Sequence, residues 1–438
     1  MVLESGVLQE RDDRYEVTGA LSSLAIPARL QDSLMARLDR LAAVKTVAQL
    51  GATIGREFSY DLITKISSLD EGILQTSLEQ LVDAELLYQH GLPPHSIYVF
   101  RHSLIRDTAY ESLLKSRRQQ YHQHIAQVLE ASPRVAEIQP EILAYHYTQA
   151  ELNQQAIAHW YEAGCRSAQR SANIETIGHL CQALGLIEKL PESPKRNQQE
   201  LMIQIALGPP LIATKGYAAP EVREVYARAQ ELCQQEDAPQ LFPILHGLWT
   251  YYLLLPDLRT AWKLAERCLR SAQMTEESSL LSGAYWALSG TSFFLGEFER
   301  SLEYADQGIA ACNERQEQHA NAFTYSQDPE TACLSYAGCA LWFLGYPNSA
   351  LKKSQEALNL ARSLNHPLSL SATLVFSAMT HLFRREWRKV RERAAEAIAI
   401  CTEYEFAFFH AAASVLDGLA LADVNFSLKG NSRTFDER

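Results

Sequence analysis

The cysteines are the side chains of this chain best suited to metal or redox chemistry. A metal site needs thiolates grouped at short spacing, and a disulfide framework needs an oxidising compartment. The chain has no paired CxxC spacing, and its eight cysteines are Cys165, Cys181, Cys233, Cys268, Cys312, Cys333, Cys339 and Cys401. This scatter predicts reduced thiols buried in the core of a cytosolic protein, with no metal site.

Acid–base and phosphate chemistry also lack a grouping of suitable residues. His122 and His124 are two residues apart on a predicted helix, so their imidazoles should point apart and cannot share an ion. No GxxxxGK[ST] loop occurs, and Gly51 to Gly55 is not followed by the lysine that holds a triphosphate. We therefore expect no catalytic residues, no cofactor and no enzymatic activity in this chain.

A basic run in the C-terminal third is the remaining candidate site. Its cations are Arg384, Arg385, Arg388, Lys389 and Arg391. Two interpretations stay open. These cations form either a solvated helix face, partly offset by Glu386 and Glu392, or a docking patch for an acidic protein partner on the solenoid.

Composition places the chain among folded proteins. Its 438 residues are 47% hydrophobic and 21% charged, which suits several domains or a repeat array. A formal net charge of −12 disfavours non-specific binding to nucleic acid or anionic membranes. The N-terminus has no apolar signal segment, and the longest apolar stretch, near 248–255, is too short for a bilayer. We expect a cytoplasmic protein that does not bind membranes.

Residues 28–130 predict a winged-helix-like module with one small β-hairpin. Leucines recur at helical spacing from Ala28, and Asp70 is a favoured N-cap residue. The β-prone runs 86–88 and 97–100 flank a loop with two prolines, which a helix cannot cross. The expected helices are 28–41, 44–51, 61–66, 70–86, 103–114 and 117–130.

The helix that begins at Asp70 is the candidate recognition helix of this module. We expect it to bury Ile73, Leu74, Leu78, Leu81 and Val82. It also carries Glu71, Glu79, Asp83 and Glu85. Because these carboxylates would repel phosphates, we expect no nucleic-acid binding, although Lys115, Arg117 and Arg118 make a basic stretch nearby.

After Pro140 the chain is predicted to repeat a helix–turn–helix unit. The units align on Pro256, Gly296, Gly345 and Arg385, which are 40, 49 and 40 residues apart. Compact residues recur five, nine, twelve and sixteen positions after each anchor, and a large apolar residue three positions before it should fill the gap opposite. Each pair has two apolar faces, so the pairs must stack into an all-α solenoid.

Several segments resemble a known family. The spacing of compact residues resembles the tetratricopeptide repeat, although its periods exceed the usual ~34 residues. Residues 26–41 (IPARLQDSLMARLDRL), 51–58 (GATIGREF) and 100–114 (FRHSLIRDTAYESLL) resemble large bacterial signalling proteins. Those proteins join a class III adenylate/guanylate cyclase domain to a STAND-type (AAA-like) ATPase, a winged helix and a tetratricopeptide-like tail. Residues 341–347 and 383–387 resemble that tail.

Compared with the family it resembles, this chain is expected to have neither the cyclase domain nor the ATPase core. The resemblance implies that His102 either contacts nucleotide bound upstream or is a structural histidine at the module's hinge, and we favour the second role. A chain truncated at both ends is expected. The expected parts are 1–27 as the remnant of an ATPase lid, 28–130 as the winged-helix-like domain, 131–424 as the tetratricopeptide-like repeats and 425–438 as a non-repeat tail.

The preferred function is that of a non-catalytic regulatory fragment of a STAND ATPase–adenylate cyclase protein. Its solenoid would bind protein partners as a sensor or scaffold, beside an ATPase or cyclase module encoded upstream. One alternative is a stand-alone tetratricopeptide scaffold, and another is a winged-helix transcriptional regulator.

Overall fold

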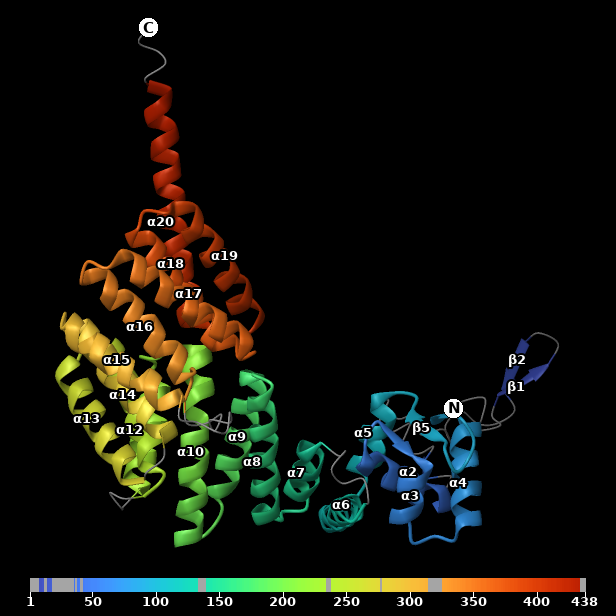
Figure 1. Ribbon diagram of the computed structural model, residues 1–438. Coiled ribbons are helices and arrows are strands. Elements are labelled where there is room, and N and C mark those ends of the chain that lie inside the picture. Colours follow the sequence, from blue (N-terminus) through green and yellow to red (C-terminus); the bar gives the residue numbers. More distant parts are fainter. Residues whose placement is uncertain are drawn as a thin grey trace. The chain divides into compact units, whose positions relative to one another are not determined.

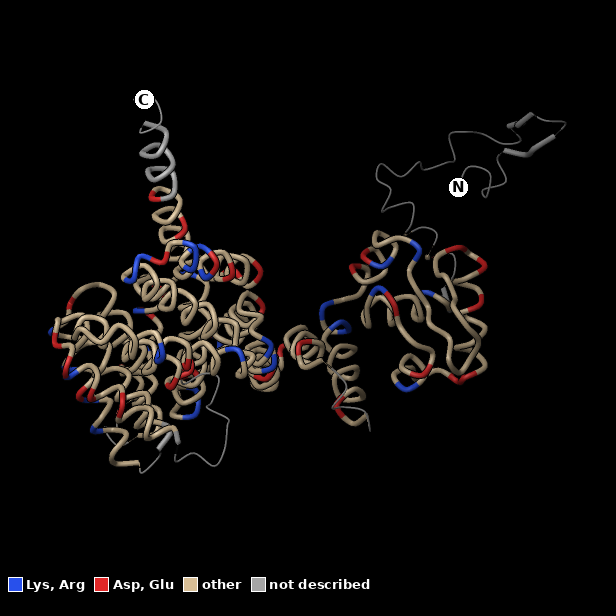
Figure 2. Tube along the Cα trace, turned by 45° about the horizontal axis from the view of Figure 1, so that its top comes forward, with Lys and Arg blue, Asp and Glu red and all other residues tan. Residues whose placement is uncertain are grey.

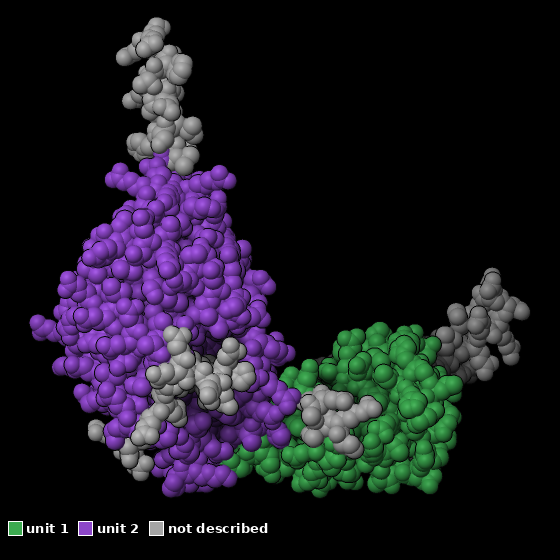
Figure 3. Space-filling model, in the orientation of Figure 1, with its two compact units in different colours: residues 1–156 green, residues 157–438 purple. Residues whose placement is uncertain are grey.

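The computed structural model describes residues 8–11, 14–17, 35, 38–39, 42–132, 139–233, 238–275, 278–313 and 325–433. The chain divides into two compact units, residues 1–156 and 157–438 (Figure 3). The predicted all-α fold class is confirmed, because helices dominate both units and the strands form only small sheets (Figure 1). Within the described residues, no helix is both long and apolar enough to cross a membrane.

Unit 1 contains the helices predicted after residue 42. Asp70 caps one of them as expected, since its carboxylate accepts a hydrogen bond from the Gly72 N–H at 3.0 Å. Most of the helix predicted at 28–41 lies outside the described residues. The helices are α2 (Ala42–Ile54), α3 (Tyr60–Ile66), α4 (Glu71–Asp83), α5 (Ser103–Glu111), α6 (Lys115–Glu130) and α7 (Pro140–Gln149).

The predicted hairpin is confirmed as β4 (Leu87–His90) and β5 (Ile97–Phe100), which pair antiparallel. A third strand that the sequence did not suggest, β3 (Glu57–Ser59), pairs with the other edge of β5. A separate hairpin joins β1 (Leu8–Arg11) to β2 (Arg14–Val17). Leu8 lies opposite Val17 in this ladder.

The core of unit 1 forms where α4 and α2 meet the small sheet. Leu74, Leu78 and Leu81 are fully buried, as predicted, but Ile73 is 54% exposed, so its predicted burial was wrong. Ile73 precedes Leu74 by one residue, which turns it about 100° away from the buried stripe. The Phe58 ring stacks on Tyr98 with centroids 5.7 Å apart and ties β3 to β5.

Unit 2 is an α-solenoid of tetratricopeptide-like helix pairs (Figure 1). Its last helix runs through most of the segment predicted as a tail. The helices are α8 (Asn153–Gln169), α9 (Asn173–Ile187), α10 (Pro194–Lys215), α11 (Pro220–Leu232), α12 (Leu241–Leu254), α13 (Leu258–Thr275), α14 (Ser278–Phe294), α15 (Phe298–Asn313), α16 (Pro329–Phe343), α17 (Pro347–Ser363), α18 (Pro367–Phe383), α19 (Trp387–Glu403) and α20 (Ala407–Arg433).

The repeat anchors lie at the tight turns between paired helices. Gly296, Gly345 and Arg385 have positive φ values of 81°, 86° and 60°, and Pro256 lies at the equivalent turn. The second helix of each pair buries its compact columns, which confirms the stacking pattern. These columns are Ala261, Ser301, Ala350 and Val390; Ala265, Ala305, Ser354 and Ala394; Cys268, Gly308, Ala357 and Ala397; and Ala272, Cys312, Ala361 and Cys401.

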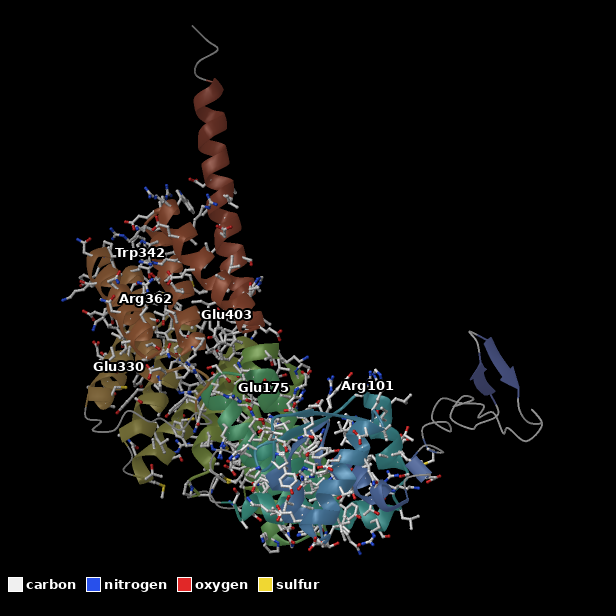
Figure 4. All side chains as sticks on the ribbon, turned by 90° about the vertical axis from the view of Figure 1, so that its right-hand side faces the viewer. Arg101, Glu175, Glu330, Trp342, Arg362 and Glu403 are labelled. Atoms are coloured by element: carbon white, nitrogen blue, oxygen red, sulfur yellow. The ribbon has the colours of Figure 1, made fainter. Side chains whose placement is uncertain are left out.

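The large apolar column before the anchors behaves differently from the prediction. Leu253 is buried, but Phe293, Trp342 and Leu382 are only half-buried, so they do not fill an interior gap. All four residues sit in the last turn of the first helix of their pair. Trp342, labelled in Figure 4, instead stacks on Phe383 of the next pair at 5.9 Å.

A contact between distant parts of unit 2 closes the solenoid on itself. Tyr217 follows α10, yet its ring packs edge-on against Phe408 and Phe409 at the start of α20, with centroids 5.3 and 6.0 Å apart. The Tyr217 hydroxyl also accepts a hydrogen bond from the Gln327 side-chain amide, just before α16. Stacking of consecutive pairs alone would leave these three segments apart, so the array curls until its ends meet.

Candidate functional site

The predicted basic patch is largely neutralised by neighbouring carboxylates. Arg384 Nε lies 2.8 Å from Glu386 Oε1, and both Arg388 and Lys389 bind Glu392, at 3.1 and 2.7 Å. Hydrogen bonds from Lys389 hold the pKa of Glu392 below its usual range.

Arg391 reaches Asp417 of α20 at 3.4 Å. Figure 2 shows Lys and Arg interleaved with Asp and Glu on this part of the chain. Of the five cations, Arg385 alone has no ion pair among the described residues. Docking of an acidic partner here stays a prediction, and the ion pairs favour the solvated-face interpretation.

The candidate recognition helix presents acidic residues to solvent. Glu71, Glu79 and Asp83 are exposed on α4, and Glu85 follows directly after the helix. Arg101 lies 2.8 Å from the Glu85 carboxylate, which further reduces the cations available for phosphates. His102, at the N-cap of α5, is exposed and makes no capping hydrogen bond.

His122 has a partner that its sequence neighbours did not suggest. Its Nδ1 lies 2.8 Å from Nδ1 of His146 on α7, and its Nε2 lies 2.9 Å from the Tyr110 hydroxyl on α5. Both histidines are almost fully buried, and this burial lowers the pKa of His122 to about 3 and of His146 to about 4. One hydrogen bond therefore joins two neutral imidazoles across α6 and α7, and in it one ring donates and the other accepts. His124 is exposed while His122 is buried, so the two imidazoles of this helix point apart as expected.

The buried thiols are poor nucleophiles. Cys268, Cys312, Cys333, Cys339 and Cys401 are buried as predicted, whereas Cys181 is exposed. Burial raises the pKa of Cys339 to about 12 and that of Cys268 still further, so these groups stay as thiols near neutral pH. Within the described residues, no three His, Cys, Asp or Glu side chains are placed to hold a metal ion.

Unit 2 contains a partly open cavity of about 300 Å³, which we name the interior pocket. Five separate segments of the solenoid line it. They are the α8–α9 turn (168–173), the middle of α10 (209–213), the segment that begins α16 (325–329), the α17–α18 turn (364–368) and Phe406 before α20. This volume lies at the lower end of the range for ligand pockets.

Neutral polar groups face apolar ones in this pocket. Side-chain amides come from Gln169, Asn173, Gln327 and Asn365, while Tyr325, Leu364, Leu368 and Phe406 give apolar surface. None of the described lining residues is Lys or Arg.

Asp328 is the lining carboxylate. Its Oδ1 accepts a hydrogen bond from the Thr331 N–H at 2.8 Å and caps α16. The pocket is therefore a polar but nearly uncharged cavity.

His366 contributes an oriented donor. Its Nδ1 accepts from the Ser369 N–H at 3.3 Å and lies 2.7 Å from the Ser369 hydroxyl. Burial lowers the pKa of His366, although the Asp328 carboxylate works against this, so the ring is neutral near pH 7. A neutral imidazole whose Nδ1 accepts must carry its proton on Nε2.

No local sequence pattern indicates the interior pocket. The turn residues Asn173 and Asn365 are typical of helix ends, and nothing in their local pattern distinguishes a binding role. The pocket joins segments more than 230 residues apart, from Ala168 to Phe406. Only the closure of the solenoid brings them together.

Comparisons with known proteins give distant relatives. No family model matches the chain. An uncharacterized protein of Rhizobium meliloti (strain 1021) is 24% identical over 427 residues, which are 95% of this chain and 41% of that protein. The chain thus spans less than half the length of this curated relative.

Several solved structures are similar to this chain at low sequence identity. A STAND signal-transduction ATPase with a tetratricopeptide repeat sensor from Pyrococcus horikoshii is 12% identical, with a TM-score of 0.49 over 91% of this chain and 56% of that one. A Rap protein in complex with competence and sporulation factor is 10% identical, with a TM-score of 0.46 over 63% of this chain and 74% of that one. Yeast Tom70 is 11% identical, with a TM-score of 0.38 over 95% of this chain and 80% of that one.

Proposed function

We propose that this chain is a non-catalytic binding protein whose solenoid recognises a partner polypeptide as a sensor or scaffold. The observation that carries the proposal is the interior pocket, because five segments of one closed solenoid converge on it. Neutral amides and a neutral imidazole beside apolar walls suit recognition by hydrogen bonds and burial. The described lining of the pocket contains no cysteine, and the raised pKa values of Cys268 and Cys339 elsewhere in unit 2 give no support to nucleophilic catalysis by those thiols.

Peptide selection followed by hydrogen exchange tests this proposal. A displayed library of random heptapeptides is selected on the purified full chain, and bound peptides are then mapped by amide exchange. We expect enrichment over a bare surface, with protection at 168–173, 209–213, 325–329 and 364–368. The proposal fails if no peptide is enriched, or if the chain turns over ATP with Mg²⁺ by itself.

A more specific proposal is that the chain regulates a STAND ATPase or cyclase module. Its support is the resemblance of residues 26–41, 51–58 and 100–114 to that family, together with a curated relative more than twice as long. The reading frame that precedes this chain should then encode an ATPase or cyclase. A frame without either would favour the stand-alone scaffold, which the pocket supports equally.

The transcription-factor alternative has less support. The acidic exposed face of α4 and the Arg101–Glu85 ion pair would both oppose phosphate contacts. Duplex binding that persists at physiological salt would revive it.

A further inference from the structure

We propose that the interior pocket binds an uncharged, extended stretch of polypeptide through its backbone amides. This inference rests on the proposed function and names the chemistry that the partner must present.

Charge excludes the commonest alternatives to a neutral ligand. None of the lining residues described is Lys or Arg, so a phosphate or a free carboxylate would be desolvated without a counter-charge. The Asp328 carboxylate is held by the Thr331 N–H at the start of α16, where the helix dipole already stabilises it. It therefore offers little attraction to a cation, and it repels an anion.

Hydrogen-bonding groups in the pocket occur as donor–acceptor pairs. Gln169, Asn173 and Asn365 are primary amides, and each carries an N–H donor beside a carbonyl acceptor. A backbone peptide group also presents one donor and one acceptor, so these side chains can pair with it in either strand direction. The Nε2–H of His366 adds a donor, because Ser369 occupies its Nδ1.

One lining residue adds an unsatisfied group. The Ser326 hydroxyl is buried and has no partner of good geometry among the described residues. A bound segment that offers an N–H group would satisfy this acceptor, whereas an apolar ligand would leave it unpaired.

Apolar surface in the same pocket accommodates uncharged side chains. Tyr325, Leu368 and Phe406 are buried lining residues, and Pro210 lies opposite in α10. Alternate side chains of an extended segment point in opposite directions, so one set can contact these residues while the other faces outward. At about 300 Å³ the pocket has room for only a few residues of such a segment.

The test compares two variants that differ in whether they touch the pocket. Gln169→Ala with Asn365→Gly removes two lining amides, and glycine keeps the turn because Asn365 has a φ of 50°. Gln355→Ala is the matched control, since Gln355 is an exposed glutamine of α17 that does not line the pocket. Gln169→Ala alone keeps the test valid if the double variant folds poorly.

The probes are heptapeptides selected on the full chain, synthesised with acetylated and amidated ends and titrated by calorimetry. We expect selected peptides to be uncharged at their centre and to bind about tenfold more weakly to the double variant, with Gln169→Ala intermediate. The Gln355→Ala variant should bind them like the wild type. An aspartate placed at the peptide's centre should weaken binding at least tenfold.

Two outcomes would overturn the inference in different ways. Peptides that need acidic residues, bind the double variant normally and are lost on Arg388→Glu with Arg391→Glu would locate recognition at the basic run. That result would leave the proposed function standing. If no peptide is enriched on the full chain over a bare surface, both the inference and the proposed function fail.

Discussion

At the scale of single residues, the unusual groups are neutral histidines in apolar surroundings. His122 and His146 face each other through Nδ1 atoms at 2.8 Å, and the Tyr110 hydroxyl occupies the remaining His122 nitrogen. One ring must donate and the other accept, so this hydrogen bond is kept with both rings neutral or with one ring protonated. Burial disfavours even the first charge, and protonation of both rings would place two N–H donors against each other, which couples the stability of unit 1 to pH.

Acid should destabilise α6 and α7 before carboxylate titration becomes dominant. The unfolded histidines titrate near the ordinary pKa of 6.5, whereas in the fold the pKa is about 3 for His122 and about 4 for His146. Below pH 6.5 the unfolded chain binds more protons, so stability falls as pH falls towards 4. At pH 5 we expect a loss of about 2 kcal/mol for each histidine relative to pH 7.

Amide exchange of α6 and α7 at pH 7 and pH 5, corrected for intrinsic rates, measures this loss. His146→Gln should reduce the pH dependence, and His124→Gln, exposed on the same α6, serves as the control. An unchanged dependence in His146→Gln would contradict the assignment.

At the scale of elements, the turns and the helix contacts define unit 2. The anchors reverse the chain between paired helices through positive φ angles, and the compact columns allow close approach. Two glycines also make room for a tyrosine ring between helices, a space that we call the Tyr226 slot. The Tyr226 ring of α11 lies against Gly208 of α10 and Gly247 of α12, where a Cβ atom would be 2.0 and 2.1 Å from its nearest atoms.

The Gly345→Ala substitution measures the free-energy cost of placing a side chain at a turn residue with positive φ. A Cβ at this position meets nothing within 4 Å, but φ is 86°, so we expect destabilisation of about 1 kcal/mol. Gly178→Ala in α9 is the matched control, with open space and helical φ, and should stabilise by about 0.5–1 kcal/mol. Tryptophan fluorescence during urea unfolding reports unit 2, because all six tryptophans lie there. Equal signs for the two variants would refute the argument.

The Gly247→Ala substitution tests the slot around Tyr226. Overpacking should cost about 1–3 kcal/mol, since both helices must separate to admit the methyl group. In a Tyr226→Leu background the same substitution should cost much less, which gives a non-additive cycle. Urea unfolding of the four proteins provides the measurement, and additive costs would mean that Tyr226 is not the obstacle.

At the scale of the whole solenoid, closure creates the binding site. Tyr217 joins the segment after α10 to α20 and to Gln327, and these contacts lie beside residues that line the interior pocket. The stability of a linear stack of helix pairs depends only on contacts between nearest neighbours, whereas the Tyr217 contact joins distant pairs and so fixes the curvature of the array.

Loss of the closing contact should loosen the ends before the middle. Tyr217→Ala removes a buried aromatic side chain, so we expect a loss of about 3 kcal/mol and faster amide exchange at the start of α20. Exchange in α13 to α15 should change little. Tyr346→Ala, at a tyrosine that is 59% exposed, is the control. Uniformly faster exchange throughout unit 2 would argue against a closing role.

Local patterns predicted the helices, the hairpin and the stacked pairs, because each depends on residues within one unit and its neighbour. Compact side chains at columns such as Ala305 and Ala350, and turns at Gly296 and Gly345, carry that information in the chain itself. The His122–His146 pair and the interior pocket could not be predicted in this way. The histidine pair depends on how α7 packs against α6, which the spacing within one helix does not fix. The pocket depends on crossing angles accumulated over many helices, so Ser171 and Phe406 line one cavity only when the array has curled.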